Sequence, residues 1–129
     1  MKIKTLDEWL GGLDLSFWGT AQHKVTPAQF LERQDSEGAV LLDVRSPEEV
    51  GQLALPFALH IPIDELPDRW LEVPTDRLVA TFCSSLTRAV LAWAYLQLRG
   101  LDQVRILDAG YEALAAELKP GRVYKRTRR

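Results

Sequence analysis

A single cysteine stands five positions before an arginine, directly after a short apolar run. Cys83 is the only cysteine of the 129 residues; residues 78–82 precede it and Arg88 follows. If this stretch is a strand end, a turn and a helix start, backbone N–H groups and the guanidinium favour thiolate over thiol. The thiolate is a nucleophile. The spacing therefore indicates a reactive cysteine, and the competing interpretation is a small apolar residue buried at a strand end.

The residues between the cysteine and the arginine are placed to bind whatever the thiolate attacks. They are Ser84, Ser85, Leu86 and Thr87. Backbone N–H groups of such a loop hold negative charge on an atom attached to the sulfur. The three hydroxyls can donate to that atom or instead cap the following helix, as Ser and Thr commonly do. Residues 83–88 are therefore the candidate catalytic and substrate-binding loop.

The elements that must position this loop follow from an alternation of apolar runs and helix starts. Capping patterns open helices at Thr5, Thr26 and Ser46. Apolar runs predict strands at residues 39–44, 58–61, 78–82 and 104–107. Helices are predicted from residue 5 to the glycines at 11 and 12, over 27–34, from 47 onward, and over 64–71, 88–99 and 111–118. This order is typical of an α/β domain whose mostly parallel sheet carries helices on both faces.

In such a sheet, sites form outside the carboxyl ends of the strands. Cys83 directly follows the strand predicted at residues 78–82, so the loop lies where a site is expected. Asp43 ends another predicted strand, and Arg45 follows it. We expect these two side chains to support the loop through an ion pair or a hydrogen bond.

Composition indicates one soluble globular domain. The chain is 47% hydrophobic and 26% charged, with no apolar run long enough for a membrane span and no secretory leader. One cysteine excludes an internal disulfide and a multi-cysteine zinc site, and His23 and His60 have no partners at ligand spacing. We therefore expect no metal, no cofactor and a cytoplasmic location.

The formal net charge of −2 conceals an asymmetry. The last nine residues hold five of the 16 Lys and Arg and none of the 18 Asp and Glu, so residues 1–120 carry −7. An acidic body is not typical of a nucleic-acid-binding domain. We expect residues 121–129 to form a solvated, frayed end, the alternative being a contact with an acidic partner or RNA.

Four segments, in this order, resemble a single-domain rhodanese. They are AVLLDVRSPEEV, ALHIPIDELPDRW, LVATFCSSLTRA and VRILDAGYEAL, and the resemblance spans residues 25–118. It implies a rhodanese-like three-layer domain over residues 25–120, with a mostly parallel sheet of about five strands. Residues 1–24 would then be an N-terminal extension packed on this domain, and residues 121–129 a basic tail.

The resemblance also implies a reaction. In this family a six-residue loop begins with a nucleophilic cysteine and ends in an arginine, matched by Cys83 and Arg88. The first strand of the family ends in Asp-x-Arg, matched by Asp43 and Arg45. The thiolate takes a sulfane sulfur from a donor such as thiosulfate, and the resulting persulfide passes it to cyanide, a thiol or a partner protein. Because there is no second cysteine, the acceptor must be external.

Loop length separates this chemistry from phosphate chemistry. Dual-specificity phosphatases of the same fold have one more residue between cysteine and arginine, so the shorter loop here favours sulfur. Three departures from the family concern the substrate and the loop shape. Ser84 replaces a frequent basic residue, which predicts a poorer site for thiosulfate. Leu86 replaces a usual glycine, which costs about 1 kcal/mol or more if its φ is positive. Residues 53–58 lack the usual histidine and glycines.

Two other functions stay open. The first is a non-catalytic rhodanese-like binding module, suggested by Leu86, the missing glycines and the basic tail. The second is phosphatase or arsenate-reductase chemistry in the same loop. Trp18, in the extension, would cover an edge of the domain or contact a second copy in a homodimer.

Overall fold

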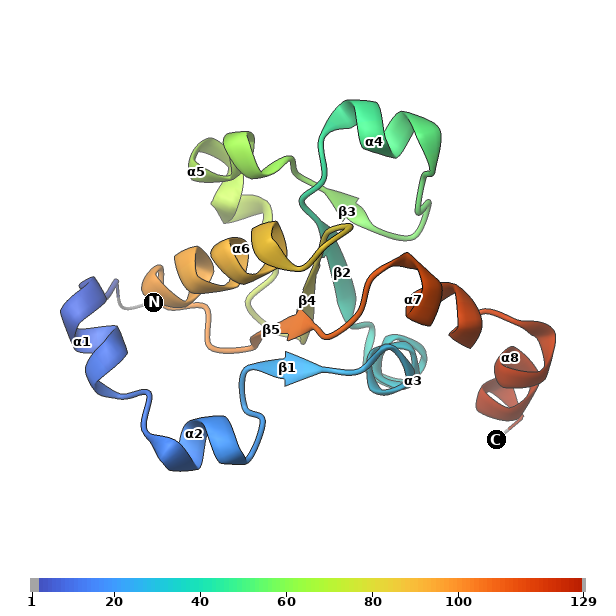
Figure 1. Ribbon diagram of the computed structural model, residues 1–129, viewed down its shortest axis with the longest axis horizontal. Helices are drawn as coiled ribbons and strands as arrows, with labels where there is room; N and C mark the ends of the chain where they lie inside the picture. Colours follow the sequence, from blue (N-terminus) through green and yellow to red (C-terminus); the bar gives the residue numbers. More distant parts are fainter. Residues whose placement is uncertain (1–2, 129) are drawn as a thin grey trace.

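A five-stranded sheet forms the centre of the molecule (Figure 1). The computed structural model describes residues 3–128. Within them the strands pair in the order β1-β5-β4-β2-β3, and each pairing is parallel. The strands are β1 (Lys24–Val25), β2 (Val40–Asp43), β3 (Leu59–His60), β4 (Val79–Phe82) and β5 (Val104–Leu107). The predicted α/β class with a parallel sheet of about five strands is confirmed.

β1 is the strand that the apolar runs do not predict. It pairs with β5, so that Lys24 lies opposite Ile106 and Val25 opposite Leu107. Val25 is buried and Lys24 is exposed. A two-residue strand with one buried side chain leaves no apolar run to detect, and it ends directly before the helix cap at Thr26.

Helices cover the sheet, and their starts largely follow the predicted caps. Thr5, Thr26 and Ser46 each form a capping box. The helix after Thr26 runs past its predicted end and stops at Gly38, whose left-handed φ of 71° suits glycine. No helix among residues 3–128 is both long and apolar enough to span a membrane. The helical segments are α1 (Leu6–Gly11), α2 (Leu15–Gly19), α3 (Pro27–Glu37), α4 (Pro47–Gln52), η1 (Ile63–Glu65), α5 (Leu66–Arg69), η2 (Trp70–Glu72), α6 (Thr87–Leu98), α7 (Tyr111–Glu117) and α8 (Pro120–Thr127).

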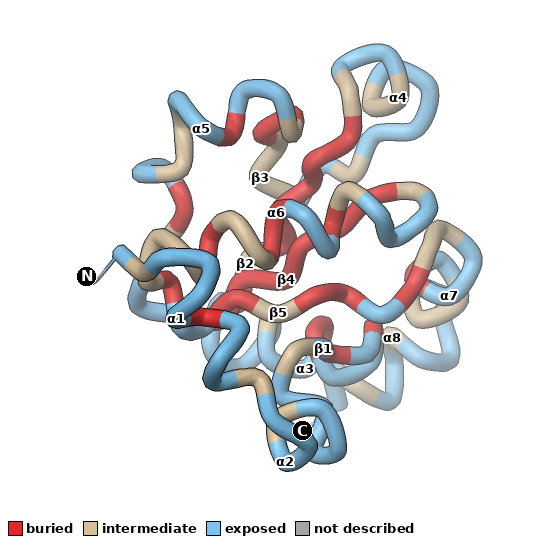
Figure 2. Tube along the Cα trace, turned by 60° about the vertical axis from the view of Figure 1, so that its left-hand side comes forward, coloured by how far each residue is buried: buried red, intermediate tan, exposed pale blue. Residues whose placement is uncertain are grey.

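Two apolar clusters hold the layers together. Successive residues of β2 point to opposite faces, with Leu42 in one cluster and Leu41 in the other. The first cluster joins the sheet to α1, α5 and α6, and the second joins it to α3 and α7. Figure 2 shows the buried strands inside this covering. Because both faces are covered, β2, β4 and β5 are mostly apolar, which is why these strands are visible in the sequence.

An aromatic cluster fastens the N-terminal segment to α6. The rings of Trp9 and Trp93 meet edge to face at 5.2 Å, and Phe17 stacks 6.3 Å from Trp93. Trp18 and His23 also meet, at 4.9 Å. The Nδ1 atom of His23 is buried and has no hydrogen-bond partner among the described residues. The neutral ring therefore suits this position better than the charged one.

The C-terminal segment departs from the expected frayed end. Residues Pro120–Thr127 form α8, with proline in the first turn, where its missing N–H costs nothing. Arg126 lies 3.3 Å from Asp35 of α3 and donates to the carbonyl of Glu117 at 3.2 Å. This bridge across 91 positions gives the basic segment a fixed partner that its composition does not reveal. Met1, Lys2 and Arg129 lie outside the described residues.

Protonation of His23 is expected to weaken the fold at acidic pH. Burial lowers its pKa from the ordinary 6.5, with a further lowering from Lys24 that Asp108 partly opposes. The stability contributed by the neutral ring is present above pH 6.5 and lost as the pH falls through the lowered pKa. The melting temperature should therefore fall further between pH 7.5 and pH 5.0 for the wild type than for His23→Phe. This variant keeps an aromatic ring without a titrating group. Equal falls for the two proteins would contradict the assignment.

Candidate active site

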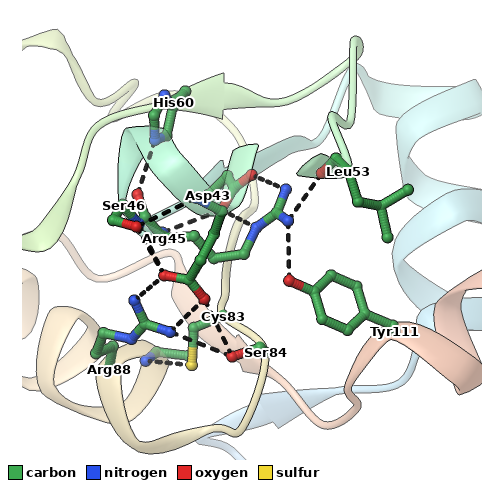
Figure 3. A network of polar contacts seen from close by, with 11 residues as sticks. Asp43, Arg45, Ser46, Leu53, His60, Cys83, Ser84, Arg88 and Tyr111 are labelled. Atoms are coloured by element: carbon green, nitrogen blue, oxygen red, sulfur yellow. Dashed lines mark hydrogen bonds and ion pairs between the residues drawn. The ribbon is translucent and has the colours of Figure 1, made fainter. Parts of the chain in front are cut away.

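Cys83 lies between the end of β4 and the start of α6, as the sequence predicts (Figure 3). Its side chain is 1% exposed, and the backbone N–H of Ala89 donates to its Sγ at 3.3 Å. Thr81 adds a second link, since its hydroxyl donates to the carbonyl of Ala89 at 2.8 Å. The strand and the first turn of the helix are thus joined around the sulfur. Among the described residues, the N–H of Ala89 makes one hydrogen bond to Sγ, and the N–H groups of residues 84–88 make none.

Leu86 forms the apex of the loop with a backbone conformation that L-residues rarely adopt. Its φ is 71° and its ψ is −36°, and the N–H of Thr87 donates to the carbonyl of Ser85 at 2.9 Å, closing a γ-turn. Leu86 therefore has the positive φ that was expected to cost free energy for a leucine. Leu86 also takes the N-cap position of α6 without a side-chain cap, so the loop hydroxyls do not cap this helix at its N-cap. Ser85, Leu86 and Thr87 are exposed.

Arg88 is paired with a carboxylate that the sequence did not assign to the site. Its two terminal nitrogens lie 2.5 and 2.9 Å from the two oxygens of Glu49, in the first turn of α4. Ser84 Oγ lies 3.4 Å from the same carboxylate and accepts from Arg88 at 3.2 Å. Hydrogen bonding from Arg88 holds the pKa of Glu49 far below its usual 4.5, so this carboxylate is ionised near neutral pH. Cys83, Ser84 and Arg88 are thus brought together, with Glu49 as a fourth member.

The signal that could have found Glu49 is its place in the capping box of α4. Its Oε1 accepts from the backbone N–H of Ser46 at 3.1 Å, which fixes the side chain at the start of the helix. The capping pattern explains why a carboxylate is present there. It does not reveal that the carboxylate also reaches Arg88, 39 positions along the chain.

Asp43 and Arg45 form a buried ion pair behind the loop. Their side chains are 1% and 0% exposed, and the guanidinium donates to Asp43 through Nε at 2.9 Å and through a terminal nitrogen at 2.6 Å. The hydrogen bonds to Asp43 raise the pKa of Arg45 above its ordinary value, so the charge is permanent. This matches the expected intramolecular ion pair; neither side chain contacts Cys83 through a hydrogen bond among the described residues.

The remaining donors of Arg45 connect two further segments. One terminal nitrogen donates to the carbonyl of Leu53 at 2.8 Å and to the hydroxyl of Tyr111 at 3.0 Å. The guanidinium carbon lies over the rings of Phe82 and Tyr111, at 5.4 and 5.3 Å. His60 contacts the carbonyl of Arg45 through Nε2 at 2.7 Å, a role in the backbone frame (Figure 3). Tyr111 is a site-supporting residue that no sequence pattern indicated.

The connection between β5 and α7 closes the loop from another side. A Cβ atom at Gly110 would lie 3.1 Å from the carbonyl oxygen of Ser84, a tight contact that the backbone of Ser84 could relieve only by moving a few tenths of an ångström. Glycine therefore suits this close approach of two backbones. On this side, the neighbour of the Ser84 carbonyl is main chain.

Comparison with known proteins assigns this arrangement to a family. The sequence model described as Rhodanese-like domain matches residues 26–117. The chain belongs to the rhodanese-like domain family. The resemblance of the four sequence segments is thereby confirmed, and residues 26–117 are called the rhodanese-like domain below.

Relatives of this rhodanese-like domain include single-domain and multidomain proteins. A sulfurtransferase of Allochromatium vinosum is 40% identical over 81 residues, covering 63% of this chain and 76% of that protein. A rhodanese-related protein of Thermoplasma volcanium has a TM-score of 0.65 at 26% identity, covering 76% of this chain and 95% of the other. An NAD-dependent persulfide reductase of A. fulgidus has a TM-score of 0.57 at 28% identity, covering 75% of this chain and 17% of that protein.

Replacing Leu86 by glycine is expected to stabilise the rhodanese-like domain. Glycine adopts a φ of 71° without Cβ crowding, and the gain outweighs the entropy that glycine loses on folding, so the free energy of unfolding should rise by about 0.5 kcal/mol. Ser85→Gly, at a neighbouring position without a positive φ, should instead lower it by about 0.5–1 kcal/mol. Urea unfolding of both variants checks the pair; a loss of stability in Leu86→Gly would show that the turn is not strained.

Removing the partner of Arg45 is expected to cost far more than removing one of its outer hydrogen bonds. Asp43→Asn leaves a buried guanidinium without an anion, which should lower the free energy of unfolding by about 3 kcal/mol or more. Tyr111→Phe deletes one hydrogen bond and should cost about 1 kcal/mol. The same urea titrations measure both. Equal costs would contradict the central place of the ion pair.

Proposed function

We propose that this protein is a sulfurtransferase that carries a sulfane sulfur as a persulfide on Cys83. The observation that carries the proposal is the position of Cys83 at the base of a six-residue loop, with an N–H donor on Sγ and a guanidinium at the end of the loop. The N–H donor favours negative charge on the sulfur, and the guanidinium, paired with Glu49, lies at the end of the loop where a bound group would meet it. The sulfurtransferase of Allochromatium vinosum, 40% identical over most of its length, supports the same class.

The reaction takes two displacement steps. The Cys83 thiolate attacks the sulfane sulfur of a donor, the S–S bond of the donor breaks, and its electron pair leaves with the departing group, sulfite in the case of thiosulfate. An acceptor nucleophile then attacks the outer sulfur of the persulfide. The S–S bond of the persulfide breaks, and its electron pair returns to Cys83 as thiolate. Cys83 is the only cysteine of the chain, so no second thiol of the same chain can take the sulfur. The acceptor is therefore external: a thiol, cyanide or a protein.

The other site residues support these steps in different ways. Ser84 and Arg88 lie beside Cys83 and are the proposed binding groups for the transferred sulfur, while Ser85, Leu86 and Thr87 form the exposed turn at the mouth. The Asp43–Arg45 pair holds the frame. The persulfide reductase of A. fulgidus, 17% of which this chain covers, supports a protein acceptor or donor for such a domain. We place the reaction in the cytoplasm, because the single cysteine is free.

One observation favours a second candidate, a non-catalytic binding module. The Cys83 side chain is 1% exposed, and Arg88 is already paired with Glu49. A donor reaches the sulfur only if the loop opens. Slow alkylation of Cys83 at neutral pH, with an apparent thiol pKa at or above the free value of about 8.5, would favour the binding module.

Intact-mass measurement tests the sulfurtransferase directly. Incubation with a sulfane donor should add the mass of one sulfur to the wild type and none to Cys83→Ser, and cyanide should then remove it. Absence of the adduct with thiosulfate and with an organic persulfide would refute the proposal, as would an adduct on Cys83→Ser. Failure of the protein to turn over aryl phosphate and arsenate would separate it from the alternative chemistries of the same loop.

A further inference from the structure

The positive charge of the cysteine loop is already neutralised inside the molecule. Both terminal nitrogens of Arg88 bind the carboxylate of Glu49, at 2.5 and 2.9 Å, and Ser84 Oγ lies 3.4 Å from the same group. The two side chains of the pair are 29% and 31% exposed, so water screens the pair only in part. The groups placed to receive an anion at the sulfur thus face a fixed negative charge.

Glu49 is held in this position by a second set of bonds. Its Oε1 also accepts from the backbone N–H and the hydroxyl of Ser46, both at 3.1 Å, in the capping box of α4. The carboxylate is therefore anchored to the helix start whether or not Arg88 is present. An incoming anion that needs Arg88 must compete with an anchored carboxylate rather than with a mobile one.

The mouth of the loop carries exposed apolar side chains beside the uncharged hydroxyls of Ser85 and Thr87. Leu86 at the apex is 37% exposed and Val90, whose N–H donates to the Leu86 carbonyl, is 40% exposed. Among the loop residues 84–88 no lysine, and no arginine other than Arg88, is present to attract a dianion. These side chains favour contact with the organic part of a donor over contact with a small, strongly hydrated ion.

We propose that Glu49 is a specificity residue that selects organic persulfides over dianionic donors such as thiosulfate. This inference rests on the proposed function and names its donor class. The reacting group of a persulfide R–S–SH carries at most one negative charge, against two on thiosulfate, so it loses less to the fixed carboxylate, and its organic part gains from Leu86 and Val90.

The transfer from such a donor balances without a further reactant. The Cys83 thiolate attacks the outer sulfur of R–S–SH, forming a new S–S bond. The S–S bond of the donor breaks, and its electron pair leaves on R–S⁻. The proton stays on the transferred sulfur, giving Cys83–S–SH. Glu49 takes no part in these bonds; it positions Arg88 and sets the local charge.

Glu49→Gln is the matched test, because glutamine also satisfies the capping box and removes only the charge. Its amide nitrogen would face the Arg88 guanidinium, donor against donor, and release it. Rates of Cys83 persulfidation are measured by intact mass with thiosulfate and with 2-hydroxyethyl persulfide, each divided by the rate of free cysteine with the same donor. Glu48→Gln is the control, since Glu48 is exposed and the substitution removes one negative charge, as Glu49→Gln does.

We expect Glu49→Gln to accelerate the thiosulfate reaction about tenfold or more, while the persulfide reaction changes less than about threefold. Glu48→Gln should change neither by more than about twofold. Thermal melting checks that Glu49→Gln is folded. If it is not, the wild type alone decides, since its normalised rate should be at least about tenfold higher with the persulfide than with thiosulfate.

Parallel changes with both donors in Glu49→Gln, or a wild type that prefers thiosulfate, would overturn the inference and leave Cys83 a sulfur carrier. Absence of an adduct with either donor in every variant would instead refute the proposed function itself. The two failures are therefore distinguishable in one set of spectra.

Discussion

The buried pair of Asp43 and Arg45 is the interaction on which the geometry of the site depends. Two opposite charges without water are stable only if further hydrogen bonds satisfy them, and Arg45 gains such bonds from the carbonyl of Leu53 and the hydroxyl of Tyr111. Each of those bonds fixes a different segment. The pair therefore orients the end of β2, the connection before β3 and the start of α7 at the same time.

The direction in which the chain leaves β2 then determines what faces the cysteine. Ser46 follows Arg45 directly and opens α4, and its capping box carries Glu49 to Arg88. The site is thus assembled from two layers of charge. An inner pair is neutral and structural, and an outer pair at the loop governs what approaches the sulfur. We expect removal of one partner of the inner pair to lower the stability of the fold. Removal of one partner of the outer pair should change the reactivity of Cys83.

The fold could be predicted where the physical cause is local. Strands covered on both faces must be apolar throughout, so β2, β4 and β5 are visible as runs, and capping needs only four consecutive residues, as at Thr26 and Ser46. β1 could not be found because two residues carry no run. α8 meets α3 through Arg126 and Asp35, a contact that no local pattern encodes.

The residues of the site also divide into those set by a local stretch of sequence and those set by contacts between distant residues. The Cys83 loop, its length and the costly φ of Leu86 follow from one short stretch of sequence, since a turn between a strand and a helix is local. The contribution of Glu49 and Tyr111 does not, because each meets its arginine across 39 and 66 positions. The loop in which the chemistry is proposed was therefore predictable as a structure, while the charge that surrounds it was not.

Gly110 has a consequence for how such a site can change. The wall beside Ser84 belongs to the connection between β5 and α7, which approaches so closely that even a methyl group at position 110 would meet the Ser84 carbonyl. The backbone position of Ser84, directly after Cys83, is consequently limited by a second chain segment that can vary independently of the loop. A longer connection there would remove this limit with the six-residue loop unaltered. The number of residues from Cys83 to Arg88 thus sets the length of the loop. How closely another segment approaches the loop is set by the connection between β5 and α7.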